Sequence, residues 1–234
     1  MKVKFYSALI AMMTSCYSIN AQWQTMYLPS QYWPATDVKS YNNQLYAGSN
    51  SGVYSSADNG ATWTDLTQGF ASSSSSSFRE LAFTSTGNIY VRTTTNSIVR
   101  SMDGGTTWGY DTAGIGFGGI QAIYYDSNSD RVFIGKGALY YKTPSDASWT
   151  KVSSTEFGTG ISPVQITGKG TKLFVIDVTS YIYESSDNGN TWTKKTGTGL
   201  PQSGSSDGAS KFISINNDLY LGVTGVWKSS ETCF

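Results

Sequence analysis

One eight-residue motif recurs along this chain and constrains its fold more than any other feature. Three close copies read Ser-x-Asp-x-Gly-x-Thr-Trp, and they occupy residues 56–63, 101–108 and 185–192. A degenerate copy runs from Lys142 to Trp149, and a fifth begins at Ser229. The first residues of the five copies lie 45, 41, 43 and 44 positions apart. A turn motif that returns at nearly constant spacing indicates one supersecondary unit repeated along the chain.

The fixed residues of the motif predict a tight turn followed by an apolar anchor. Asn-Gly or Gly-Gly between two β-rich runs favours a hairpin turn, because these residues tolerate positive φ angles. The Asp is placed to accept hydrogen bonds from N–H groups of the turn itself. The Trp then begins the next strand as a large apolar side chain. We assign these structural roles to Ser56, Asp58, Gly60, Trp63, Ser101, Asp103, Gly105, Trp108, Trp149, Ser185, Asp187, Gly189 and Trp192.

Short apolar runs complete each repeat. A triplet such as Leu173-Phe174-Val175 is followed by a second run such as Ile182-Tyr183, and a further run precedes the triplet. Each period therefore holds four short strands, which is the content of one β-propeller blade. A β-sandwich also has many short strands, but it gives no reason for one turn to recur at constant spacing. We therefore predict an all-β chain that forms a β-propeller of four-stranded antiparallel blades.

The repeat also sets the expected boundaries. Four complete blades are expected at about residues 37–66, 79–110, 120–152 and 163–195, with an incomplete fifth at 210–234. Residues 22–27 resemble the strand after each motif, so we expect them to form an outer strand of the closing blade. This strand could close a five-bladed ring, or the chain could be a fragment of a larger ring. We favour the truncated ring, because the fifth motif copy fails at residues 231–234.

The motif resembles the Asp-box, also called the BNR repeat, of sialidase-like β-propellers. The resemblance covers nearly all of residues 22–234. In that family the box joins the third and fourth strands of each blade, on the face opposite the active site of the members that are enzymes. Propellers of this kind usually have more than five blades, which also favours a truncated ring. The resemblance thus implies a fold and a structural role for the box, and it implies no activity.

The N-terminal residues predict the localisation of the protein. Residues 1–21 combine a basic start with a short apolar run, which is typical of a secretory signal peptide cleaved after Ala21. A lipoprotein anchored through Cys16 is the alternative. The apolar run is too short to span a bilayer. We expect a protein that is secreted, or that lies at the cell surface or in the periplasm.

Charge and composition exclude several function classes. Cleavage would remove two of the 16 basic residues and leave 14 against 16 acidic ones. Without a basic patch, neither nucleic acid nor an anionic membrane is an expected partner. The chain has no histidine, which removes Ser–His catalysis and histidine metal sites. No second carboxylate completes a calcium loop around the motif aspartates, and the glycine-rich residues 114–119 precede a strand and not a helix. We expect no metal and no cofactor.

The arginines test the enzyme hypothesis that the resemblance raises. Sialidases bind the substrate carboxylate with three arginines, and this chain has four in all. Arg100 and Arg131 are expected on the face that carries the motifs. Only Arg79 and Arg92 are expected near the opposite face, here called the top face, which carries the loops between blades. An arginine triad cannot be assembled from two residues.

We therefore expect a binding or scaffold propeller that holds a protein or a glycan with its top-face loops. A fragment of a secreted glycoside hydrolase, of the sialidase or xyloglucanase kind, is the alternative. The expected contacts are the charged residues and loop aromatics of the top face, namely Arg79, Arg92, Lys136, Asp177, Phe70, Phe117 and Phe157.

Overall fold

The computed structural model describes residues 26–29, 34–67, 70, 77–157, 160–196, 211–215, 218–222 and 226–228. Over these ranges the chain forms strands and short 3-10 segments, at Thr67 and in η2 (Thr155–Phe157), without an α-helix. The strands make five antiparallel sheets, four of them with four strands and one with three. No helix in the described part of the chain is long and apolar enough to cross a membrane.

Within every sheet the strands pair in chain order. The first sheet contains β1 (Ala35–Tyr41), β2 (Gln44–Ser49), β3 (Val53–Ser56) and β4 (Thr64–Asp65). The second contains β5 (Phe78–Phe83), β6 (Ile89–Thr93), β7 (Ile98–Ser101) and β8 (Gly109–Tyr110), and the third contains β9 (Ala122–Asp126), β10 (Arg131–Gly135), β11 (Leu139–Lys142) and β12 (Thr150–Lys151). The fourth contains β13 (Pro163–Lys169), β14 (Lys172–Asp177), β15 (Ile182–Ser185) and β16 (Thr193–Lys194), and the fifth contains β17 (Lys211–Ile215), β18 (Asp218–Gly222) and β19 (Val226–Lys228).

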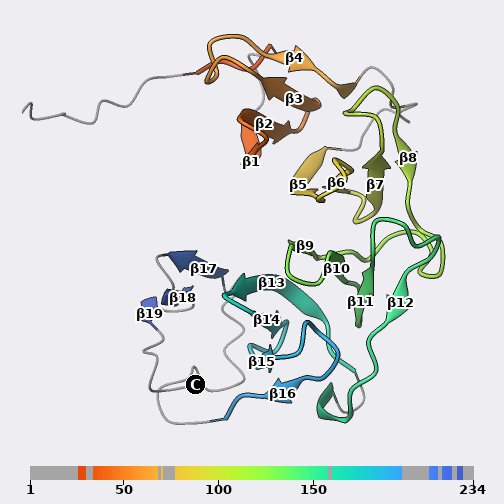
Figure 1. Cartoon of the computed structure of the whole chain (residues 1–234), viewed down its shortest axis with the longest axis vertical. Coiled ribbons are helices and arrows are strands. Elements are labelled where there is room, and N and C mark those ends of the chain that lie inside the picture. The colour runs from red at the N-terminus through yellow and green to blue at the C-terminus, as the bar shows by residue number, and fades with distance from the viewer. Residues whose placement is uncertain are drawn as a thin grey trace, which may run out of the picture.

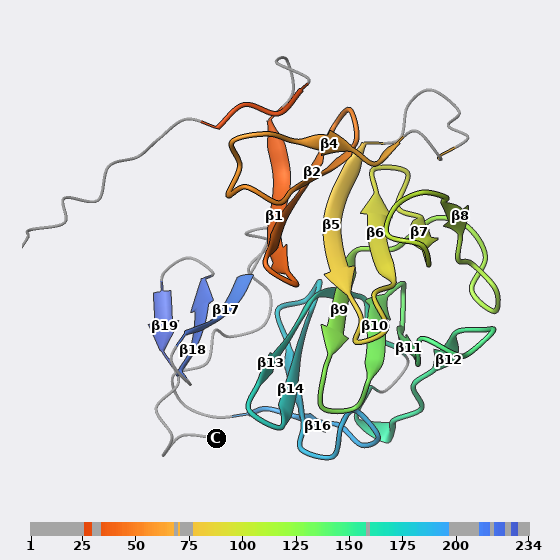
Figure 2. The same cartoon turned by 45° about the horizontal axis from the view of Figure 1, so that its top comes forward.

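The five sheets follow one another along an arc around a central space (Figure 1). The first strands of consecutive sheets contact one another, from β1 through β5, β9 and β13 to β17. Figure 2 shows the sheets from β1 to β16 as successive layers. The arc is open between the first and the fifth sheet (Figure 1). Antiparallel four-stranded sheets placed radially in this way are the blades of a β-propeller, so the predicted fold class is confirmed.

The apolar core lies between neighbouring sheets. Phe133 and Leu139 of the third sheet pack with Leu173, Val175 and Trp192 of the fourth. Similar clusters fill the other three spaces between consecutive sheets. The inner sheets are thus buried on both faces, which explains why their strands read as continuous apolar runs and not as an apolar–polar alternation.

The three close motif copies fold into the same turn between the third and fourth strands. In the first copy the Ser56 hydroxyl donates to Asp58 Oδ1 and accepts from the Gly60 N–H, both at 2.8 Å. The Asp58 carboxylate accepts from the N–H and the hydroxyl of Thr62 at 2.8 and 2.6 Å. The copies that begin at Ser101 and Ser185 repeat these four hydrogen bonds. The Asp carboxylate thus accepts hydrogen bonds within its own turn, and the Ser and Thr complete the turn.

Trp108 and Trp149 join their sheets to the preceding ones, whereas the indole N–H of Trp192 donates to the Gly189 carbonyl of its own turn. The indole N–H of Trp108 donates to the Leu66 carbonyl at 2.7 Å, and that of Trp149 donates to the Asp111 carbonyl at 2.8 Å. Leu66 and Asp111 directly follow the outer strands of the first and second sheets. Trp108 and Trp149 also pack in the apolar clusters between their own sheet and the preceding one, and Trp149 is buried.

The degenerate motif copy exchanges an apolar contact for a buried ion pair. Lys142 stands in the place of the motif Ser and is fully buried, and its Nζ lies 3.1 Å from both Asp111 carboxylate oxygens. Arg100 Nε lies 3.5 Å from the same carboxylate. At the preceding interface Leu66 fills the equivalent space, because a Cβ on Gly105 would lie 2.9 Å from its Cδ1. The local sequence around Lys142 and Asp111 does not predict this ion pair.

Some expectations fall outside the described ranges. They concern the signal peptide at residues 1–21, the lipoprotein alternative at Cys16 and the fifth motif copy from Ser229. Of the strand expected at residues 22–27 only Met26 and Tyr27 are described, and neither lies in a strand.

Candidate binding site

Arg79 occupies a β-bulge at the start of the inner strand of the second sheet. Phe78 pairs with Thr93 and Glu80 with Arg92, so Arg79 is the extra residue between two paired ones. A bulge redirects the side chain that it carries and often lies beside a functional site. Arg79 is exposed, and its strand begins directly after the loop from the first blade, at the top end of the sheet.

The equivalent bulge of the first sheet serves a structural purpose. The register of β1 shifts between Ala35 and Asp37, and the Thr36 hydroxyl between them donates to the Phe78 carbonyl. Asp37 Oδ2 then accepts from the Leu81 N–H at 2.9 Å. These bonds tie the first blade to the second. Arg79 forms no ion pair or hydrogen bond with another described residue, so its guanidinium faces solvent with its donors available.

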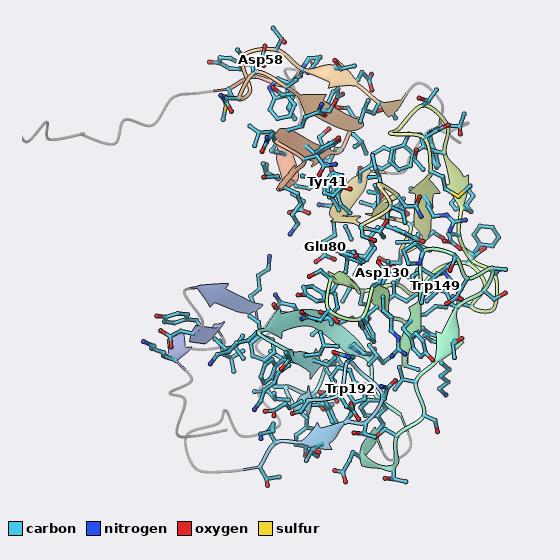
Figure 3. All side chains as sticks on the ribbon, viewed as in Figure 1. Tyr41, Asp58, Glu80, Asp130, Trp149 and Trp192 are labelled. Atoms are coloured by element: carbon cyan, nitrogen blue, oxygen red, sulfur yellow. The ribbon has the colours of Figure 1, made fainter. Side chains whose placement is uncertain are left out.

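Glu80 and Arg92 form an ion pair beside Arg79. Arg92 Nε lies 3.0 Å from Glu80 Oε2, and both side chains are partly exposed. Glu80 lies on the side of the second sheet that faces the central space (Figure 3). Burial raises the pKa of the Glu80 carboxyl, an effect that the Arg92 charge opposes and the Asp37 charge reinforces. Glu80 thus neutralises Arg92, and Arg79 remains the uncompensated cation of the group.

Lys136 supports a loop and does not extend freely into solvent. Its Nζ donates to the carbonyls of Gly116 and Phe117 at 2.8 and 3.0 Å. These bonds hold the glycine-rich loop between the second and third sheets, which does not lead into a helix, as expected. Phe117 on this loop is 70% exposed, and its ring lies 5.1 Å from that of Tyr110. Lys136 therefore contributes to a top-face surface by fixing Phe117 in place.

Two expected contacts are directed into the protein. Asp177 is buried, and its Oδ1 accepts from the Thr179 N–H, the Thr179 hydroxyl and the Tyr181 N–H at 2.9, 2.7 and 2.9 Å. The carboxylate thus stabilises its own turn. Phe157 is also buried, with its ring centroid 5.3 Å from that of Tyr183 and 6.1 Å from that of Trp192. We therefore remove Asp177 and Phe157 from the set of surface contacts.

Neither metal binding nor a sialidase site is supported by the described residues. No cluster of three or more His, Cys, Asp or Glu side chains lies among them. Arg131 donates to the Asn188 carbonyl at 3.0 Å and to Asn190 Oδ1 at 2.9 Å, so it binds a motif turn as expected. Arg100 is directed to Asp111. Only Arg79 and Arg92 are left near the top face.

The fold and this site define a β-propeller with one free arginine at the top of an inner strand. The chain belongs to the DUF6242 beta propeller domain family, whose model matches residues 7–221. A xyloglucanase from Hypocrea jecorina (strain QM6a) is 33% identical over 156 residues, which are 61% of this chain and 17% of that protein. This chain thus spans about a sixth of that relative.

Two solved structures share the fold at low sequence identity. YCF48 from Cyanidioschyzon merolae superposes with a TM-score of 0.62 at 14% identity, over 86% of this chain and 70% of that one. The extracellular domain of a putative one-component system from B. thetaiotaomicron gives a TM-score of 0.63 at 16% identity, over 82% of this chain and 27% of that one.

Proposed function

We propose that this chain is a secreted Asp-box β-propeller that acts as a binding or scaffold module for a protein or a glycan. Three turns with the same four hydrogen bonds support the Asp-box assignment. Their carboxylates are engaged within the turns, so the boxes stabilise blades and leave binding to the top face. The fold shared with an extracellular domain supports a location outside the cytoplasm.

The observation that carries the proposal is the exposed Arg79 at its bulge. A guanidinium with free donors binds carboxylate or phosphate oxygens through two parallel hydrogen bonds. The ion pair between Arg92 and Glu80 beside it adds a donor and an acceptor on the same strand pair. The ligand group that fits this arrangement is an anion flanked by hydroxyl or amide groups, as in an acidic glycan or an acidic peptide.

Arrays of glycans and peptides test this function. We expect the purified chain to retain a set of acidic ligands, and we expect Arg79→Ala to lose most of them with an unchanged melting temperature. Arg131→Ala is the matched control, because Arg131 binds a motif turn on the opposite face. Equal retention by the wild type and Arg79→Ala would contradict the proposed site, and loss in Arg131→Ala alone would place binding on the motif face.

A fragment of a glycoside hydrolase is the second candidate, and the similarity to a xyloglucanase favours it. Such hydrolysis needs two carboxyl groups that face one substrate. Of the acids described near the top face, Glu80 pairs with Arg92 and Asp177 stabilises its own turn. Release of reducing ends from xyloglucan by the purified chain, lost in Glu80→Gln, would establish this candidate in place of the binding module.

A further inference from the structure

On one face of the first sheet the inner-strand residue Val38 is exposed, although Ala47 and Tyr54, which lie beside it in register on the next two strands, are 1% and 3% exposed. Val38 pairs with Ala47, and the residues in the same register position of the next three sheets are Leu81, Ile123 and Ile166. These three are 3%, 6% and 5% exposed because the preceding sheet covers them, whereas Val38 is 55% exposed. An apolar side chain at a position that is otherwise part of the core marks an unfilled interface.

A buried polar group on the same sheet also has no partner. The indole N–H of Trp63 is enclosed and meets no acceptor among the described residues. The equivalent groups of Trp108 and Trp149 donate to carbonyls of the preceding sheet. A buried donor without an acceptor costs about 1–3 kcal/mol. The indole N–H of Trp192 donates instead to the Gly189 carbonyl of its own turn at 3.0 Å, so in the described part of the chain Trp63 lacks both a carbonyl of a preceding sheet and one of its own turn.

Met26 packs against the first motif turn at the position where Leu66 packs against the second. A Cβ on Gly60 would lie 2.2 Å from Met26 Sδ, as a Cβ on Gly105 would lie 2.9 Å from Leu66 Cδ1. Leu66 belongs to the segment that follows the outer strand of the preceding sheet. The chain before β1 therefore passes the first motif turn where a preceding blade would end.

The fifth sheet carries the complementary half of this interface. The central aromatic residue of each apolar triplet faces the next sheet, and Tyr90, Phe133 and Phe174 are almost fully buried there. Tyr220 occupies this position in the fifth sheet and is only partly buried. The outer face of the fifth sheet thus presents the aromatic side chain of Tyr220. At the other interfaces such a side chain covers the apolar position that Val38 occupies in the first sheet.

The charges at the two ends are also complementary. Asp37, Glu80 and Lys211 occupy one register position on the inner strands of the first, second and fifth sheets, opposite Gly48, Arg92 and Gly222. Adjacent blades bring the residues at this position close together. Asp37 Oδ2 accepts from the Leu81 N–H at 2.9 Å, and the Asp37 charge helps to raise the pKa of Glu80. A fifth sheet placed before the first would bring the exposed Lys211 next to Asp37, and these charges attract.

We propose that the β17–β19 sheet covers the exposed face of the β1–β4 sheet, so that the arc closes into a five-bladed ring. The two sheets stand apart in Figure 1. Closure would require a small rotation of each sheet relative to its neighbour at all four interfaces. The sequence favours a truncated larger ring, whereas the matching ends favour closure. A closed ring would surround the central space on all sides, and this inference does not depend on what binds there.

Matched substitutions test whether Val38 is covered. We expect Val38→Lys to lower the melting temperature by at least half of the loss caused by Ile166→Lys, because both would bury a charge between blades. Lys211→Glu should also lower it, since it places a negative charge beside Asp37. The protein should remain a monomer by light scattering. A tolerated Val38→Lys would overturn the proposal, and so would a dimer that Val38→Lys dissociates, because a second copy would then be the covering partner.

A distance measurement provides a second test that does not depend on stability. Gln44, Lys172 and Asp218 each begin the second strand of their sheet. Spin labels would be attached at Gln44 and Asp218 in a variant whose native cysteines are replaced by serine. The reference pair, Lys172 and Asp218, lies on the adjacent fourth and fifth sheets. We expect the two distance distributions to overlap, and a Gln44–Asp218 distance longer than the reference by the width of a blade or more would refute closure.

Discussion

The buried ion pair between Lys142 and Asp111 gives the most informative test of how the blades adhere. In Lys142→Met the Asp111 carboxylate stays in place with Arg100 at 3.5 Å as its remaining charged partner. Removing one partner of a buried pair costs about 3–5 kcal/mol. Because Arg100 keeps part of the compensation, we expect the lower end, about 3 kcal/mol. For a chain of this size that lowers the melting temperature by about 6–12 °C.

The double variant Lys142→Met/Asp111→Leu restores the chemistry of the preceding interface, where Leu66 fills the space. We expect its free energy of unfolding to lie within about 1 kcal/mol of the wild type, since apolar replacement of a buried pair is often neutral or stabilising. Lys39→Met is the control, because the Lys39 side chain is exposed, its Nζ lies 3.8 Å from Asp37, and its loss should change stability by less than about 1 kcal/mol. Thermal and urea unfolding measure all three variants. Additive losses in the double variant would refute the reasoning.

Three further perturbations follow from the motif turns and the top face. Trp192→Ala should cost about 3–5 kcal/mol in thermal unfolding, because it removes a buried aromatic side chain, and a loss below about 1 kcal/mol would contradict its role. Hydrogen bonds from the motif Thr hold the pKa of Asp58 and Asp103 at about 2, below an unfolded value of about 3.9. The stabilisation of the folded state by these two ionised carboxylates is therefore complete above about pH 4 and is lost as the pH falls toward 2. The melting temperature should decline over that window, and it should decline less in Asp58→Asn/Asp103→Asn. The chain should not hydrolyse a fluorogenic sialoside between about pH 4 and 8, since it lacks an arginine triad; turnover that Arg92→Ala abolishes would show otherwise.

The sequence predicts the blades well because the fold is periodic. A turn that recurs at nearly constant spacing places every strand between its neighbours, so the four-stranded sheets follow from the positions of the motifs. The turn itself depends on residues within eight positions of one another, which is why the role of Asp58 could be predicted. Local patterns of this kind need no knowledge of which blades touch.

Contacts between blades could not be predicted in the same way. Lys142 and Asp111 are 31 residues apart, and nothing in either local sequence indicates that their side chains meet. The bulge at Arg79 is visible only in the register of β5 and β6. Asp177 did carry a local signal, because an Asp followed by a Thr two residues later often closes its own turn. That pattern predicts a carboxylate that accepts hydrogen bonds within its own turn and is not a surface contact.

The division between structural motif turns and a binding top face is tested most directly by comparing two single variants on the same ligand array. We expect Arg79→Ala to lose the acidic ligands at an unchanged melting temperature. Asp187→Ala should lower the melting temperature, by the equivalent of about 1 kcal/mol, and keep every ligand, because its carboxylate only accepts hydrogen bonds within its turn. The reverse pattern, with ligands lost in Asp187→Ala at full stability and kept in Arg79→Ala, would contradict this division of roles.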